Sequence, residues 1–166
     1  MSENTQITEL SRDFILSQYR MNKDNIIVLF KDLSVPEYLA LRNILQYSTP
    51  EPDGTERIYL SDLSEKMKLS MPQISKMAER LNDKGLVVWT HERSGRNGTY
   101  VQITNAGKEL LTNKEELFRD FFGRVIDRYG KDKMTELLQR MGELETIITD
   151  EIGEIPDCDS KNGYLS

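Results

Sequence analysis

The stretch that decides the fold runs from residue 70 to residue 85 and reads SMPQISKMAERLNDKG. Ser70 as a cap, Pro72 in the first turn and Gln73 at the third helical position are typical of a helix start. Gly85 stands where a chain leaving a helix turns left-handed. The sequence therefore predicts a helix over residues 71–84. At helical spacing its expected buried face holds Ile74, Met77, Ala78 and Leu81.

The residues on either side of this helix predict a winged helix-turn-helix. A short helix from Ser61 to about residue 68 comes before it, and only the turn Leu69-Ser70 separates the two. Two stretches rich in β-branched and aromatic residues follow, at 86–90 and 99–104, with a polar segment over 91–98 between them. Two helices joined by a tight turn and followed by a β-hairpin form the winged helix-turn-helix motif.

Most of the remaining chain is predicted to be helical, so the expected fold class is mainly α with a small β-hairpin wing (α+β). A capping box at Ser34 and Glu37 begins a helix that runs to about Tyr47. Residues 48–54 are a loop by composition, and residues 58–60 fit a short strand. The expected buried stripe of the helix after Ser34 holds Leu39, Leu41, Ile44 and Leu45.

Composition excludes several classes of protein. The chain has 166 residues, enough for one domain, and its longest apolar run, residues 26–30, is five residues long. Because a bilayer-spanning helix needs about 20 apolar residues, no membrane segment is expected. The N-terminus lacks the pattern of a signal peptide, which predicts a cytoplasmic protein. One His and one Cys leave no metal cluster and no nucleophile pair, so neither an enzyme nor a bound cofactor is expected.

The outward side of the helix that follows Ser70 carries Gln73, Lys76 and Arg80. Gln can bond adenine bidentately, Lys and Arg can bond guanine, and amides at a helix N-terminus bind phosphate. Ser70 and Ser75 can add contacts to the DNA backbone. Taken alone, Lys76 and Arg80 fit equally well a solvated face that pairs with neighbouring carboxylates.

The polar segment between the two predicted strands shifts that balance toward DNA. Arg93 and Arg96 lie in it, beside Gly95 and Gly98. Guanidinium groups at the tip of such a hairpin extend into a narrow minor groove. An isolated hairpin with two Arg would fit an ordinary surface loop, but this one directly follows a candidate recognition helix.

The chain resembles the MarR family of bacterial transcriptional regulators over about residues 30–152, most specifically over 60–110. The matching residues are Leu69 to Leu81, Lys84-Gly85-Leu86-Val87, the wing, and Ile103-Thr104-Asn105-Ala106-Gly107. The resemblance implies a homodimer whose two winged lobes read consecutive major grooves of a pseudo-palindromic double-stranded DNA operator. It also implies a repressor that is released by a small phenolic or amphipathic ligand or by oxidation. An effector pocket is expected between the first helix, the helix after Ser34 and the helix after Thr104, whose apolar and Tyr-bearing faces suit a small aromatic or amphipathic effector.

Carried over residue by residue, the resemblance places DNA contacts of the recognition helix (71–84) at Ser70, Gln73, Ser75, Lys76 and Arg80. The wing (91–98) departs from the family pattern, because the Asp-x-Arg motif falls on Gly95-Arg96-Asn97 and lacks its Asp. Either Arg96 or Arg93 then takes the minor-groove role.

The helices outside the winged lobe (34–104) are expected to form the dimer. They are residues 5–20 and residues 105–152, with a flexible acidic tail at 153–166, all within one domain. The last helix, about 132–152, has apolar residues at alternating spacings of three and four, the narrow seam by which a helix packs along a partner. Packing within a monomer is the alternative. The seam consists of Met134, Leu137, Met141, Leu144 and Ile148.

Charge keeps a second hypothesis open, a winged-helix module or anti-regulator that binds a protein instead of DNA. Glu79 and Asp83 on the outward side of the recognition helix favour it. The net charge of −6 is unevenly spread, however, since residues 57–100 hold eight basic and five acidic side chains, a net +3. The rest of the chain then carries −9, so the acidic total does not exclude DNA.

Overall fold

The computed structural model describes residues 3–23, 27–51, 54–92 and 98–155. The chain divides into two compact units, Met1–Leu117 and Phe118–Ser166. The predicted residues Arg93 and Arg96, and all but the first three residues of the predicted tail at 153–166, lie outside the described residues.

The first unit holds the helices that surround the predicted recognition helix. The helix predicted at 5–20 is present and extends past both expected ends, and the recognition helix ends at Asp83, one residue early, with Lys84 as its C-cap. The helical elements of this unit are α1 (Glu3–Lys23), the 3-10 helix η1 (Ile27–Phe30), α2 (Val35–Tyr47), α3 (Leu60–Met67), α4 (Met71–Asp83) and the first part of α5 (Asn105–Tyr129).

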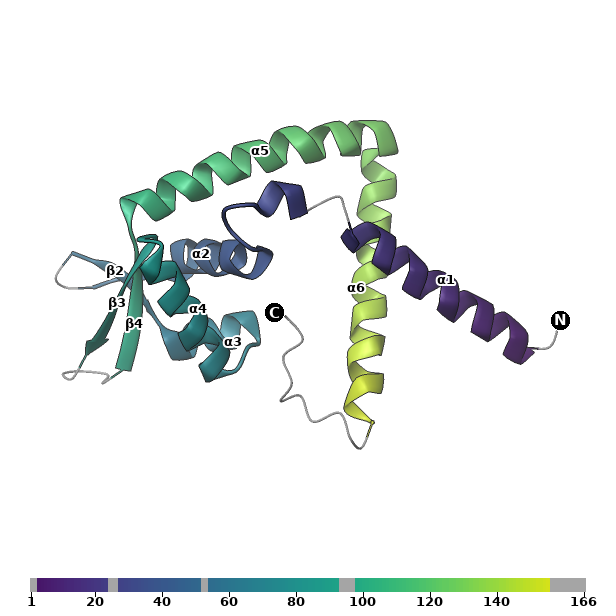
Figure 1. Ribbon diagram of the computed structural model, residues 1–166, viewed down its shortest axis with the longest axis horizontal. Helices are drawn as coiled ribbons and strands as arrows, with labels where there is room; N and C mark the ends of the chain where they lie inside the picture. The colour runs from purple at the N-terminus through teal and green to yellow at the C-terminus, as the bar shows by residue number, and fades with distance from the viewer. Residues whose placement is uncertain (1–2, 24–26, 52–53, 93–97, 156–166) are drawn as a thin grey trace. The chain divides into compact units, whose positions relative to one another are not determined.

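The β-structure of this unit is a four-stranded sheet, which has one strand more than the predicted hairpin and the short strand predicted at 58–60. It contains β1 (Thr49–Pro50), β2 (Glu56–Tyr59), β3 (Val87–Glu92) and β4 (Gly98–Ile103), in the order β1-β2-β4-β3 and antiparallel throughout. Because β2 pairs with β4, the short strand expected near Ile58 joins the hairpin to the helices. The loop predicted at 48–54 includes β1, which turn-rich composition concealed. Figure 1 shows the hairpin of β3 and β4 beside α4.

The core of the first unit lies between the helices and one face of the sheet. All four residues predicted to face inward from α4 are buried, which confirms the predicted periodicity. The other walls come from α2, α3 and the two central strands. Their buried apolar residues include Leu41, Ile44, Leu60, Leu63, Ile58, Val87 and Val101.

The prediction for α2 is half wrong. Leu41 and Ile44 are buried as expected, but Leu39 and Leu45 are exposed, and the helix buries Glu37, Tyr38 and Ala40 instead. Two contacts explain the rotation: Lys84 bonds the Glu37 carboxylate, and the Tyr38 ring packs edge-on against Phe30 with ring centroids 6.0 Å apart. One partner distant in the sequence, Lys84, and one just before the helix, Phe30, therefore contact the face of α2 that turned inward.

The second unit contains the end of α5 and all of α6 (Lys131–Gly153). Gly130 separates the two helices with φ +101°, a conformation that favours glycine, in agreement with a last helix predicted to begin at about residue 132. No residue of α6 is buried. Of its apolar seam, Leu137, Met141 and Leu144 are exposed, whereas Met134 and Ile148 are half-buried. Among the described helices, none combines the length and apolar character that crossing a bilayer requires.

Candidate nucleic-acid interface

The start of α4 is fixed by hydrogen bonds between Ser70 and Gln73. The Gln73 Oε1 accepts from the backbone N–H and from the hydroxyl of Ser70, both at 2.9 Å. Pro72, in the first turn, lacks an N–H that the helix would leave unsatisfied. Both Ser70 and Gln73 are exposed. A bidentate bond to adenine needs the amide oxygen and nitrogen of Gln73 together, so base contact requires Oε1 to exchange its bonds with Ser70 for the base.

Lys76 and Arg80 lie exposed on the outward side of α4, opposite its buried face. Neither forms an ion pair with any residue in the described part of the chain. The alternative reading, in which neighbouring carboxylates neutralise them, therefore has no support from the described residues. Glu79 and Asp83 share the outward side and are exposed as well. Two free cations and two carboxylates face the same surface.

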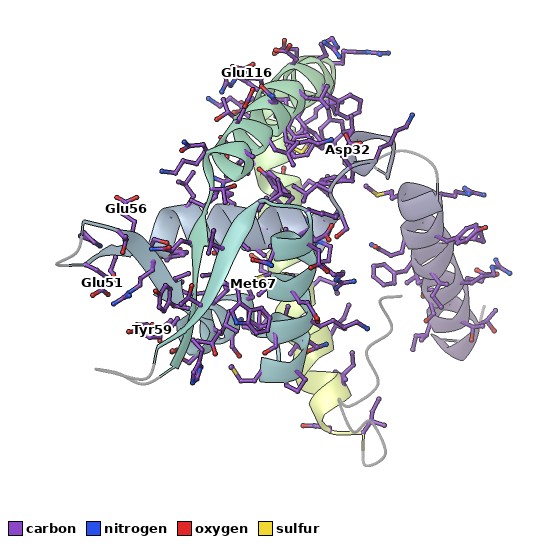
Figure 2. All side chains as sticks on the ribbon, turned by 60° about the vertical axis from the view of Figure 1, so that its left-hand side comes forward. Asp32, Glu51, Glu56, Tyr59, Met67 and Glu116 are labelled. Atoms are coloured by element: carbon purple, nitrogen blue, oxygen red, sulfur yellow. The ribbon has the colours of Figure 1, made fainter. Side chains whose placement is uncertain are left out.

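Ser75 lies on the side of α4 near Trp89 of β3 and Thr99 of β4, and it is half-buried. It lines a hollow of about 240 Å³ between the helices and the hairpin. Tyr59, labelled in Figure 2, lies at the end of β2 and packs edge-on against Tyr100 of β4, with ring centroids 6.1 Å apart. The hollow is lined by Tyr59, Leu60, Ser61, Met71, Ser75, Trp89, Gly98 and Thr99.

Several residues of this hollow were missed by sequence reasoning as part of the interface. Met71 and Trp89 are exposed there, and Ser61 and Thr99 contribute hydroxyl groups. Alternation along the strand did not predict that Trp89 is exposed, because β3 exposes two neighbouring residues, Val88 and Trp89. The Asn82 Oδ1 accepts a hydrogen bond from the Trp89 backbone N–H at 3.3 Å, which joins α4 to β3.

The predicted wing, residues 91–98, is partly strand. His91 pairs with Thr99 and Glu92 pairs with Gly98 in the β3–β4 ladder, so the connection is shorter than expected. The His91 Nδ1 and the Thr99 Oγ1 are hydrogen-bonded at 3.0 Å. β-Pairing continued into this polar segment because the ladder needs only backbone groups. Arg93 and Arg96, predicted to enter the minor groove, lie outside the described residues.

Of the basic residues counted over 57–100, two that the structure describes, Arg57 and Lys84, are engaged in internal ion pairs. Arg57 bonds Glu51 at 3.2 Å and lies over the Tyr100 ring, 4.3 Å from its centroid. Lys84 bonds the Glu37 carboxylate at 2.9 Å. The basic surface of the lobe is therefore weaker than its sequence count suggests, and the outward side of α4 contributes a larger share of it.

The electrostatics of Glu37 follow from its position at the start of α2. Burial alone raises the pKa of this carboxyl, but hydrogen bonds from the Ser34 backbone and from Lys84 favour the charged form. The Ser34 hydroxyl and the charge of Lys84 act in the same direction, and the net result is a pKa below the ordinary value. Glu37 is therefore a buried, charged partner of the residue that ends α4.

A second hollow, of about 510 Å³, lies on the last turns of α5 in the second unit. It is lined by Phe121, Arg124, Val125, Arg128 and Tyr129, which combine two guanidinium groups with aromatic and aliphatic surface. Its volume is in the range of small-molecule sites. Among the described residues, no group of His, Cys, Asp and Glu side chains could hold a metal ion.

Known proteins match this chain in structure and not in sequence. No family model matches the sequence, and no curated protein matches it. Solved structures do match. The chain is similar to MarR from Staphylococcus aureus, in complex with salicylate and kanamycin, with 16% identity, 90% of this chain and 99% of that one covered, and a TM-score of 0.64.

Two further structures agree. A mutant MarR from E. coli, in complex with operator DNA, is 17% identical, with 87% of this chain and 99% of that one covered and a TM-score of 0.62. A MarR family regulator from Neisseria meningitidis is 19% identical, with 90% and 97% covered and a TM-score of 0.58. The chain therefore has the fold of the MarR family, the mainly α winged-helix architecture predicted from its sequence. Of these structural neighbours, one is bound to operator DNA and one is described as a MarR family regulator.

Proposed function

We propose that the protein is a sequence-specific DNA-binding transcriptional regulator without enzymatic activity, acting in the cytoplasm where DNA is accessible. The recognition helix, α4 with its C-cap, enters the major groove of a pseudo-palindromic operator, and the wing (91–98) enters the minor groove. DNA contacts are assigned to Ser70, Gln73, Ser75, Lys76, Arg80, Arg93 and Arg96. The observation that carries the proposal is the pair Lys76 and Arg80, exposed on α4 without a carboxylate partner among the described residues.

The protein is proposed to act as a homodimer of one MarR-like domain. The lobe over 34–104 reads DNA, and the helices at 5–20 and 105–152 form the dimer. The exposed apolar seam of α6 supports this assignment, because a helix that buries none of its residues leaves its apolar face uncovered. Two-fold symmetry places the half-sites of the operator about one helical turn apart.

A small effector is proposed to release the protein from its operator, as expected of a ligand-responsive repressor. The hollow on α5 supports a ligand that has both a carboxylate and an apolar body, because Arg124 and Arg128 lie beside Phe121 and Tyr129. The S. aureus structure contains salicylate, a ligand of that kind.

Binding to the protein's own promoter fragment tests the proposed function. Fluorescence anisotropy against rising salt is expected to show affinity that falls steeply, since each phosphate contact releases counterions. Arg96→Ala is expected to weaken binding about fivefold and to reduce the salt slope by about one. Absence of binding even at low salt would contradict the proposal.

A protein-interaction module is the second candidate, favoured by the exposed carboxylates Glu79 and Asp83 on the outward side of α4. These groups repel phosphates, and a basic partner would accept them. The same promoter titration separates the two functions, because a protein-binding module shows no salt-dependent association with DNA.

A further inference from the structure

The end of α4 is held on one side by Lys84, its C-cap residue. The Lys84 Nζ donates to Glu37 Oε2 at 2.9 Å and to Glu37 Oε1 at 3.0 Å. It also lies 3.4 Å from the Asp32 carbonyl oxygen. Glu37 is only 5% exposed and simultaneously accepts hydrogen bonds from the backbone N–H and hydroxyl of Ser34. One carboxylate thus joins the start of α2 to the end of the recognition helix.

The other side of the same turn is held by the residue before α5. The Thr104 hydroxyl donates to the Gly85 carbonyl at 2.8 Å, and the Thr104 N–H donates to the Leu86 carbonyl at 3.0 Å. A side chain at Gly107 would collide with the Leu86 carbonyl oxygen, so α5 begins in direct contact with this turn. The exit of α4 has little freedom to shift on this side.

The segment that carries Glu37 is itself anchored to α5. The Lys114 Nζ donates to the Leu29 carbonyl at 2.9 Å and lies 3.5 Å from the Asp32 carboxylate. Lys114 is 8% exposed, so its charge is held almost entirely by these oxygens. Figure 2 labels Asp32 in the segment before α2, beside α5. Lys84 at the end of α4 and Lys114 on α5 therefore both bond to residues within the segment 29–37.

We propose that Lys84 and Glu37 are positioning residues that set the orientation of the recognition helix on DNA. The inference rests on the proposed DNA-binding function and adds to it, since neither residue belongs to the assigned contact set. Arg80 lies one turn and Lys76 two turns before Lys84, about 6 Å and about 12 Å along the axis. Because a helix moves as a rigid rod over such lengths, a shift at its end displaces both side chains relative to the base edges.

Stability alone is a weak reason for this ion pair. The Glu37 carboxylate is buried while the Lys84 side chain is 40% exposed, so burying the carboxylate costs desolvation and the exposed ammonium group returns only part of that cost. An apolar pair would not fix the orientation of the two residues relative to each other. Here both Glu37 oxygens accept hydrogen bonds from the Lys84 ammonium group, and together they fix its position. Direction matters more for sequence discrimination than for total affinity, because base contacts depend on geometry while phosphate attraction tolerates displacement.

The test compares operator binding with binding to random DNA for Glu37→Gln. Gln at this position retains a capping-box side chain, but the charge that holds Lys84 is lost. The ratio of operator affinity to random-DNA affinity is expected to fall about fivefold. Since both affinities are measured on one sample, a change in the folded fraction cancels from the ratio.

Three lysine variants separate positioning from direct phosphate contact. Lys84→Arg keeps the pair and is expected to retain the ratio, whereas Lys84→Met is expected to lower it as Glu37→Gln does. Lys108→Met is the matched control, because Lys108 is exposed on the first turn of α5 and its side chain bonds to neither Lys84 nor Glu37. It is expected to leave the ratio unchanged.

The outcomes differ for the two claims. If the wild-type protein binds neither DNA, the proposed function fails and the positioning role falls with it. If the wild type discriminates and Glu37→Gln discriminates equally well, the positioning role alone is overturned. A Lys84→Met variant that loses affinity for both DNAs equally, with a smaller salt slope, would assign Lys84 to phosphate contact instead.

Discussion

Two amphipathic helices of this chain, α4 and α6, differ in whether their apolar face is buried. In α4 the residues at helical spacing are buried, Leu81 completely, and the polar side faces outward. In α6 the apolar seam is equally regular, yet no residue is buried and Leu144 is 41% exposed. Periodicity therefore indicates that a face needs a cover, but it does not identify what provides the cover.

The difference also separates two tasks within one chain. The cover of α4 comes from α2, α3 and the sheet, all within its own unit, so α4 is held rigidly and its outward side chains are preorganised. An α6 without a cover in its own unit is suited to association, since a second copy of the chain would supply the missing surface. The proposed DNA contact depends on the first property and the proposed dimer on the second.

The largest effect is expected from Leu81→Ala, which breaks the cover of α4. Removing a fully buried Leu leaves a cavity, and the free energy of unfolding should fall by about 3 kcal/mol. Urea unfolding followed by far-UV circular dichroism measures it. Leu144→Ala on α6 is the matched control. At low protein concentration, where the proposed dimer dissociates, it should change the free energy of unfolding by less than about 1 kcal/mol. Equal losses in both variants would mean that α6 is covered within the monomer.

The next effect concerns the seam itself. The double substitution of Leu137→Lys and Leu144→Lys introduces two like charges on the apolar face of α6, and association of two copies would have to desolvate them. The dissociation constant of the dimer is expected to rise about a hundredfold. Light scattering on a size-exclusion column measures the mass at several concentrations. A wild-type mass equal to 19.3 kDa at all concentrations would refute the proposed dimer.

A smaller effect is expected on the outward side of α4. Lys76→Ala and Arg80→Ala should each reduce operator affinity about tenfold, because each removes a charged contact to a base or a phosphate. The circular dichroism and the dimer mass should not change, since both side chains are exposed. Lys133→Ala on α6 serves as the matched control, with the same loss of charge outside the reading lobe. If both α4 variants bound the operator normally, the assignment of the recognition face would be wrong.

Local signals explain how much of the fold could be predicted. Ser70, Pro72 and Gln73 lie within four residues, and their capping interactions form at the start of the helix itself. The start of α4 was therefore predicted correctly. The same holds for the capping box of α2 and for the break at Gly130. Bounds shifted by a few residues where neighbouring strands or caps extended an element.

Long-range pairs explain what could not be predicted. Lys84 and Glu37 are 47 residues apart, and Lys114 bonds the Leu29 carbonyl across 85 residues. Neither pair has a signature in sequence spacing, and the first of them turned Glu37 inward where a leucine stripe was expected. At the candidate site, Lys76 and Arg80 were found because helical periodicity exposes them, whereas Met71 and Trp89 depend on how the wing packs against α4.

The smallest effect is a pH dependence that belongs to the reading lobe and not to α6. Glu37 has a lowered pKa in the folded protein, so its charged form contributes stability that is present in full above the pKa of the unfolded chain. That contribution is lost as pH falls through the lowered folded value, because the protonated carboxyl no longer holds Lys84. Glu37→Gln has no such group. The difference in free energy of unfolding between wild type and Glu37→Gln should therefore be constant near pH 7 and shrink toward about pH 3. Glu136→Gln on α6 provides the contrast, since the ion pair of Glu136 with Arg140 is exposed on both sides and worth little in water. A difference for Glu37→Gln that does not change with pH would show that the Lys84–Glu37 pair does not form in solution.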